Sequence, residues 1–280
     1  TPDDIQAIST FVQMEMLEAG YAAVAEFHYV HHQADGTPYA DIGELSARVA
    51  AAADVSGIGL TLLPVLYQQA GCMGASLAPG QVRFGNDVDR FAALHTRATA
   101  IMAALPADAG IGVAPHSLRA VNRDGLAAAV GLAAGQPLHM HLAEQVDEVD
   151  EVLGAYGQRP VDWLLDNYGV DESWCLIHCT QMSDDETIRL ARTGAVAGLC
   201  PITESSLGDG IFNGARYLDA GGRFGIGSDS NIRIALSEEL RTLEYSQRLR
   251  VRLRAVLATD TASTGRVLYA GAVRGGAQAA

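Results

Sequence analysis

The sequence predicts an α/β fold built on a parallel β-sheet. Seven short apolar runs alternate with longer stretches in which apolar residues recur at helical spacing. The runs are almost continuously hydrophobic, as strands covered by helices on both faces are. The chain has 280 residues, 49% of them hydrophobic, which is enough for one (β/α) barrel of about 250 residues. We therefore expect a single barrel domain over residues 1–280.

The predicted strands follow one another in regular order. They lie near residues 22–27, 57–66, 110–114, 137–141, 174–178, 195–200 and 223–227. A closed (β/α) barrel has eight strands, and this chain opens on a helical pattern. The simplest interpretation places the first strand before Thr1. A seven-stranded variant or an open doubly wound sheet is the alternative.

The predicted helices have recognisable starts. A proline follows Thr1 at the first helical position, where its missing amide hydrogen costs nothing. Ser183 and Glu186 have the spacing of a capping box. A long helix is predicted near residue 237, with Leu240 and Leu243 at helical spacing.

The charge of the chain excludes two classes of partner. A formal net charge of −14 argues against nucleic acid, because phosphates need a basic protein face. The same charge argues against an anionic membrane surface, and no run approaches the ~18 apolar residues of a membrane span. We therefore expect neither nucleic acid nor membrane as a partner.

Composition also limits the available chemistry. The four cysteines form no CxxC pair or disulfide framework, which fits a reduced, cytoplasmic setting. All 19 basic residues are arginine, so Schiff-base catalysis by lysine, a P-loop lysine and a carbamylated-lysine metal bridge are excluded. Any metal must be bound by His, Asp, Glu or Cys.

The run of residues 137–144 is the most informative part of the chain. His139 and His141 are two residues apart on a predicted strand, so their side chains point to the same face. Glu144 falls on the loop that follows. A metal ligand beside a proton-transferring carboxylate can activate water. The alternatives are a hydrogen-bonded core role, favoured for His139, and helix capping by Glu144.

Other polar residues also fall at predicted strand ends, where barrels place their catalytic groups. His178 and Asp229 each follow an apolar run, with a structural histidine and an Asx turn as the alternatives. Arg119 follows the run that ends near His116. In an acidic protein, an arginine there indicates an anionic substrate group, because guanidinium binds carboxylate bidentately. A solvated surface arginine is the alternative.

Two further clusters keep more than one interpretation. His28, His31 and His32 form either a metal site or a polar loop over the mouth of the active site. Cys175 and Cys179 flank a histidine at ligand-like spacing. They do not share its strand parity, so we expect them to be small hydrophobic residues.

The motifs at these strand ends resemble the amidohydrolase superfamily and, within it, the N-formimino-L-glutamate deiminases. The strand-end histidine and aspartate pattern is that of the superfamily. The His-Ser-Leu-Arg and Leu-Gly-Asp-Gly-Ile-Phe stretches point to the narrower group. The similar segments are residues 25–32, 115–121, 139–145, 203–212 and 227–231.

The resemblance implies a metal-dependent site in a barrel of this superfamily. It implies one Zn²⁺ per subunit, with His141 and Asp229 among its ligands. Glu144 and His178 would transfer protons and polarise the substrate, together with Asp229. The substrate-binding residues that it implies are Tyr29, His116 and Arg119.

The implied reaction is hydrolysis of N-formimino-L-glutamate to N-formyl-L-glutamate and ammonia in histidine degradation, by a homodimer. The substrate is thus a small anionic formimino amino acid. The family's first-strand His-x-His pair and flanking β-sandwich are not in this chain, so we expect it to be incomplete at both ends. The alternatives are an aminohydrolase of the guanine deaminase kind and a truncated chain without catalytic activity.

Overall fold

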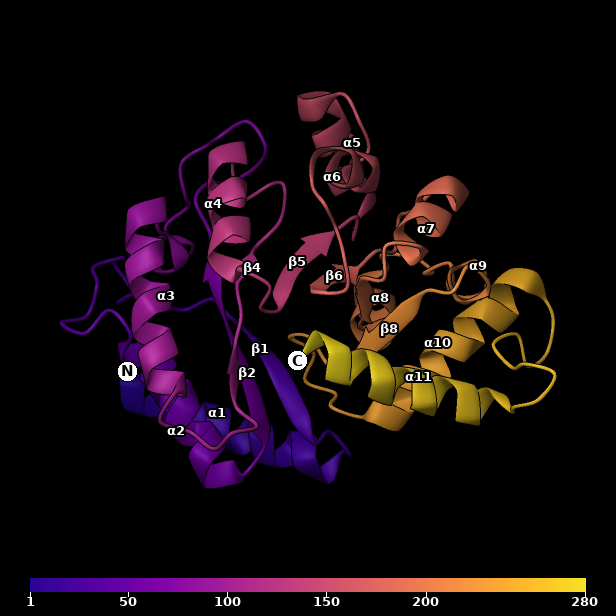
Figure 1. The fold of residues 1–280 in the computed structure, drawn as a ribbon, viewed down its shortest axis with the longest axis horizontal. Coiled ribbons are helices and arrows are strands. Elements are labelled where there is room, and N and C mark those ends of the chain that lie inside the picture. The colour runs from indigo at the N-terminus through magenta and orange to yellow at the C-terminus, as the bar shows by residue number, and fades with distance from the viewer. The chain divides into compact units, whose positions relative to one another are not determined.

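The computed structural model describes residues 1–280 and consists of two compact units, which are described separately. The first comprises Thr1–Met140 together with Ala280, and the second comprises His141–Ala279. Each unit contains parallel strands with helices between them (Figure 1). The strand β5 (Leu138–Leu142) begins in the first unit and ends in the second.

The first unit is built on a four-stranded parallel sheet. Strand β2 lies between β1 on one side and the short strands β3 and β4 on the other. Nearly all of β2 is buried, and helix α1 packs against α2. The elements are α1 (Pro2–Glu18), β1 (Ala23–His28), α2 (Glu44–Ser56), β2 (Gly59–Leu66), the 3₁₀ turn Val82–Phe84, α3 (Val88–Met102), β3 (Gly110–Ile111), β4 (Ala114–Pro115) and α4 (Arg123–Ala133).

The strand predicted over residues 110–114 is divided into β3 and β4 by Gly112. A Cβ atom at Gly112 would lie 2.3 Å from the carbonyl oxygen of Pro137, so only glycine allows this close approach. The amide of Val113 donates to that same carbonyl, while the amide of Gly112 still donates to Leu62. The chain therefore changes its hydrogen-bonding partner in the middle of the predicted strand.

The second unit is built on a parallel sheet in the order β5-β6-β7-β8. Helix α11 lies against β8, where a Cβ atom at Gly275 would be 1.8 Å from the carbonyl oxygen of Phe224. The elements after β5 are α5 (Val146–Tyr156), α6 (Pro160–Asn167), β6 (Trp174–His178), α7 (Asp184–Ala191), β7 (Val196–Leu199), α8 (Pro201–Leu207), α9 (Gly214–Asp219), β8 (Arg223–Ile226), α10 (Leu236–Val251) and α11 (Thr264–Ala279).

The predicted α/β class and the parallel pairing are confirmed, and each of the seven apolar runs forms strand. The helix starts are confirmed as well: the Ser183 hydroxyl accepts from the amide of Glu186, whose carboxylate accepts from the amide of Ser183. The single domain, the closed eight-stranded barrel and the missing first strand remain predictions. None of the helices is long and apolar enough to cross a bilayer.

Candidate active site

The second unit has an unusual backbone at the ends of its strands. Ala143, His178, Cys179 and Asp229 have φ angles of 51°, 71°, 53° and 53°. Left-handed conformations are uncommon for residues with a Cβ and cluster where function requires them. They occur here just after β5, at the end of β6 and just after β8. The backbone is thus strained where the chain leaves β5, β6 and β8. These are the segments that carry the predicted catalytic residues.

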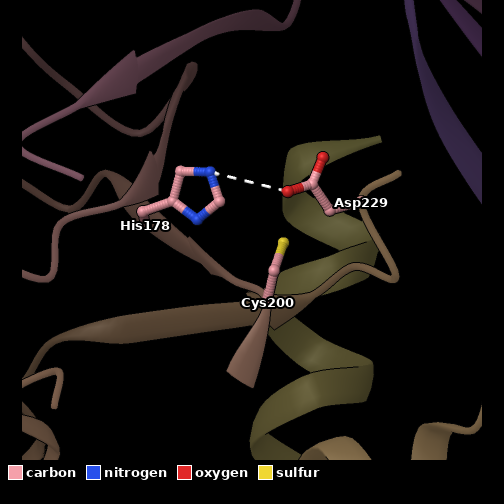
Figure 2. A group of neighbouring side chains, drawn as sticks. All are labelled: His178, Cys200 and Asp229. Carbon is pink, nitrogen blue, oxygen red and sulfur yellow. Dashed lines mark ion pairs between the residues drawn. The ribbon is translucent and has the colours of Figure 1, made fainter. Parts of the chain in front are cut away.

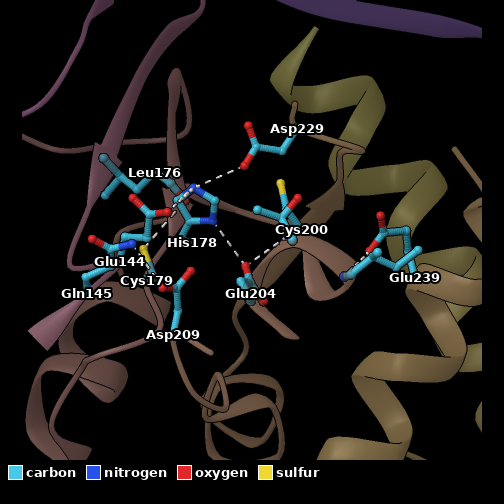
Figure 3. Close-up of polar contacts among 12 residues, drawn as sticks. Glu144, Gln145, Leu176, His178, Cys179, Cys200, Glu204, Asp209, Asp229 and Glu239 are labelled. Carbon is cyan, nitrogen blue, oxygen red and sulfur yellow. Dashed lines mark hydrogen bonds and ion pairs between the residues drawn. The ribbon is translucent and has the colours of Figure 1, made fainter. Parts of the chain in front are cut away.

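His178 lies at the centre of a group of carboxylates (Figure 3). Its Nε2 atom is 3.6 Å from Oε1 of Glu144 and 3.8 Å from Oδ2 of Asp229. Its Nδ1 atom is 3.3 Å from Oε1 of Glu204. The ring of His141 stacks on it, with centroids 5.5 Å apart. The structure thus brings together the residues predicted to act in catalysis and metal binding.

The group is negatively charged and largely shielded from water. The side chain of His178 is 1% exposed, that of Glu144 13% and that of Asp229 23%. Burial alone would lower the pKa of His178. The hydrogen bond to Glu204 and the nearby charges of Glu144 and Asp229 act against burial, and they raise the pKa above its usual value. Even a protonated imidazole ring would carry only one positive charge against three carboxylates, so the site favours an additional cation.

Three donor atoms at this site converge (Figure 2). A ring nitrogen of His178, Sγ of Cys200 and a carboxylate oxygen of Asp229 lie within 4.8 Å of one another. Nitrogen, sulfur and oxygen are the donors that zinc accepts in proteins, and the surplus of negative charge suits a divalent ion. The donor set therefore fits zinc, the metal that the family resemblance implies. His141, a predicted ligand, lies outside this trio and contacts it through its stacked ring.

Cys200 was not predicted to belong to the site. It directly follows β7 and precedes α8, and its side chain is buried. Burial and the adjacent charges of Glu204 and Asp229 raise the pKa of its thiol well above the usual value. Its place at the end of the predicted apolar run 195–200 was the available signal, but cysteine is also a common core residue.

The loop that carries Glu144 is held in position by the buried carboxylate of Glu148. Oε1 of Glu148 accepts from the amide of Ala143 at 3.0 Å, and Oε2 accepts from the amide of Glu144 at 2.9 Å. Gln145 donates to Oδ1 of Asp209 at 3.1 Å. Helix α5 has Gln145 at its N-cap, so Glu144 lies one residue before the cap position. Glu148 was not predicted from the sequence, because its hydrogen-bond partners are backbone amides, which leave no pattern of residue types.

In the first unit, two of the predicted substrate-binding residues meet in an aromatic cluster. The ring centroids of Tyr29 and His116 are 5.5 Å apart, and those of Tyr67 and His116 are 4.6 Å apart. Burial raises the pKa of Tyr67, and the positive charge of Arg119 acts against this rise. Tyr67 is the member of the cluster that was not predicted.

The histidines at the end of β1 are interior residues. His28, His31 and His32 are at most 4% exposed, with ring centroids 5.1 and 6.0 Å apart. Nε2 of His31 is 2.9 Å from the carbonyl oxygen of Val65, and Nε2 of His32 is 2.9 Å from Oδ1 of Asn86. The three histidines are therefore buried, and their roles as a metal site or as part of a polar loop over the active site both remain predictions.

The remaining predicted core residues are buried. His139 is 4% exposed, as expected for a residue with a core role. Cys175 and Cys179 are buried free thiols, and burial raises the pKa of Cys175 to about 12. Both cysteines thus have the environment of small hydrophobic residues.

Known proteins resemble the chain along its whole length. It is 50% identical to formimidoylglutamate deiminase of Pseudomonas aeruginosa and spans 62% of that protein. It matches the crystal structure of an amidohydrolase from Brucella melitensis with a TM-score of 0.98 and 52% identity, again over 62% of the other chain. A zinc-bound adenosine deaminase from Xanthomonas campestris has a TM-score of 0.80 at 22% identity, covered to 57%, and so shares the fold.

The chain thus spans about three fifths of the length of these relatives. The model of the amidohydrolase family matches residues 1–268, which include every strand and every strand-end residue described above. Given this match and the strand-end histidines and aspartate that it contains, the chain belongs to the amidohydrolase family.

Proposed function

We propose that this protein is a zinc-dependent deiminase that hydrolyses N-formimino-L-glutamate to N-formyl-L-glutamate and ammonia. The observation that carries the proposal is the convergence of Glu144 and Asp229 on one nitrogen of His178. The 50% identity to formimidoylglutamate deiminase supports this choice of substrate.

The side chains of the site can perform the proton transfers of this reaction. His141 and Asp229 would hold the metal, with Cys200 in reach of the same position. A bound Zn²⁺ would act as a Lewis acid and lower the pKa of water toward about 7. Asp229 takes a proton from the attacking water, whose oxygen bonds to the formimino carbon. His178 stabilises the charge that develops in this step.

Glu144 completes the reaction by delivering protons to the leaving nitrogen. The carbon–nitrogen bond then breaks, ammonia leaves and the formyl oxygen comes from water. The amide of Glu144 donates a hydrogen bond to Glu148, which fixes the loop. This suits the role of Glu144, because proton transfer needs a carboxylate at a fixed position. Tyr29, His116 and Arg119 would contact the substrate, with Arg119 on a glutamate carboxylate.

The proposal also covers the metal content, the oligomeric state, the cellular location and the complete fold of the enzyme. It comprises one zinc ion per subunit, a homodimer in the cytoplasm, and a (β/α)8 barrel whose first strand and flanking β-sandwich lie outside these residues. The similarity of the strand-end motifs to those of the deiminases supports these points.

The test is ammonia release by the purified, zinc-loaded protein from N-formimino-L-glutamate and, separately, from guanine. The Arg119→Ala variant should raise KM for the formimino substrate about 10- to 100-fold, because a hydrogen bond to a charged group contributes about 1.5–3 kcal/mol. Arg254→Ala, an exposed arginine, is the matched control and should leave KM unchanged. Ammonia from guanine alone, with no effect of Arg119→Ala, would support the guanine deaminase alternative instead.

A further inference from the structure

We infer that Glu204 is a positioning residue for His178, and that its carboxylate fixes which ring nitrogen faces the reacting atoms. Oε1 of Glu204 lies 3.3 Å from Nδ1 of His178, and the Glu204 side chain is 5% exposed (Figure 3). As far as catalysis is concerned, this inference rests on the function proposed above.

The carboxylate of Glu204 is itself held in place. Its Oε1 atom accepts from the amide of Cys200 at 2.9 Å, so the side chain folds back onto the start of its own helix, α8. The start of α8 is also held by a residue of another helix. Oε2 of Glu239 on α10 accepts a hydrogen bond from the amide of Ile202 at 2.8 Å. The Glu204 oxygen is therefore held by the amide of Cys200, and the helix start that carries this amide is held by Glu239.

The contact determines the orientation of the imidazole. An ionised carboxylate can only accept a hydrogen bond, so Nδ1 of His178 must carry a proton. The other nitrogen, Nε2, then faces Glu144 and Asp229 and is the atom at which a proton can be gained or lost. The backbone of His178 is left-handed, with φ of 71°, a conformation that persists where the surrounding structure holds it.

Nothing else around the ring replaces this contact. The neighbours of Nε2 are carboxylates as well, so without Glu204 a flipped ring could present Nδ1 to Glu144 or Asp229 instead. A carboxylate on the far nitrogen removes this ambiguity, as it does for histidines that bind metals.

The test combines kinetics with ¹⁵N NMR of histidine-labelled protein, in which the signals of His178 are assigned from a His178→Asn variant. In the parent protein, Nδ1 of His178 should be protonated. Glu204→Ala should mix the two tautomers and lower kcat about 10- to 100-fold with KM within about twofold, the usual range for loss of such a partner. Glu204→Gln keeps an acceptor oxygen and should recover part of kcat.

Glu186→Ala is the matched control. Glu186 is also buried, and it also accepts from a backbone amide at a helix start, that of Ser183 at 2.7 Å. It does not contact His178, so its loss should lower the Tm without moving the ¹⁵N signals of His178 or kcat.

The inference is overturned if Nδ1 of His178 is unprotonated in the parent protein, or if Glu204→Ala leaves the ¹⁵N signals and kcat unchanged. If Glu204→Ala does not fold, Glu204→Leu decides, because it fills similar space without an acceptor oxygen, and an Nδ1–H signal identical to the parent's would contradict the role. A protein that releases no ammonia would refute the proposed reaction, and the tautomer measurement would still test Glu204.

Discussion

The local charge balance at His178 explains how this site is constructed. Buried charges are costly unless they are paired, and three carboxylates around one imidazole leave an excess of negative charge. The neighbouring buried acid Glu148 forms hydrogen bonds with backbone amides, which disperse its charge. The negative charge that faces His178 is carried by Glu144, Glu204 and Asp229, where a metal ion and a substrate proton would be stabilised.

The proposed role of Glu144 in proton transfer can be tested with a single substitution. Replacing it by glutamine keeps the shape of the side chain but removes the base, so kcat should fall about 10²- to 10⁴-fold, as expected for loss of a general acid–base group. Ammonia release under saturating substrate measures this. Asp150→Asn removes an exposed acid from the following helix and should leave kcat within about twofold. Equal kcat values for the parent and Glu144→Gln would show that proton transfer occurs elsewhere.

Single residues could be predicted from the sequence where chain position alone sets their surroundings. His141, Glu144, His178 and Asp229 each follow an apolar run, and the ends of parallel strands meet at one edge of a sheet. Glu204 lies beyond such an end on a different element, and its contact with His178 joins residues 26 positions apart. Spacing in the sequence carries no information about such a contact.

At the scale of elements, strand identity was predictable and strand continuity was not. Near-continuous apolar runs mark buried parallel strands whatever they pair with. The division into β3 and β4 depends on the approach of Pro137 to Gly112, which follows from where another segment lies. The glycine itself was visible in the sequence, but a glycine inside a strand can equally mark a bulge.

The end of β1 leads to a prediction about acid stability. Burial lowers the pKa of His28 to about 4, below the unfolded value of 6.5, and also lowers the pKa of His31 well below its usual value. The unfolded chain therefore binds protons between these values and the folded chain does not, so stability is fully present above pH 6.5 and falls toward pH 4. For His28 alone the loss is of order 3 kcal/mol.

Denaturant unfolding of the parent and the His28→Asn variant from pH 7 to pH 4 measures this effect. Asparagine does not titrate in this range, so the variant should lose less free energy of unfolding on acidification. The carboxylates titrate in both proteins, and the difference between the two slopes isolates His28. Identical slopes would mean that His28 is not held neutral in the fold.

At the scale of the whole molecule, the net charge acts in opposite ways on a metal cation and on an anionic substrate. A net charge of −14 raises the local concentration of cations around the protein and repels anions. Many of the arginines that oppose this charge are engaged in pairs, such as Arg97 with Asp41 and Arg189 with Asp162. Under the proposed function, a substrate with carboxylates needs a local positive group, and Arg119 is the residue proposed to supply it.

The same reasoning predicts that the protein retains zinc. After dialysis against metal-free buffer, metal analysis should find one zinc ion per chain, and Asp229→Asn should weaken binding at least tenfold, because it removes both a ligand and a negative charge. Zinc at 100 times its Kd should add about 2.7 kcal/mol to the free energy of unfolding, which chelation removes. His28→Asn is the matched control: zinc lost from this variant and kept by Asp229→Asn would place the metal in the histidine cluster. Little zinc in the parent protein would favour the alternative of a chain without catalytic activity.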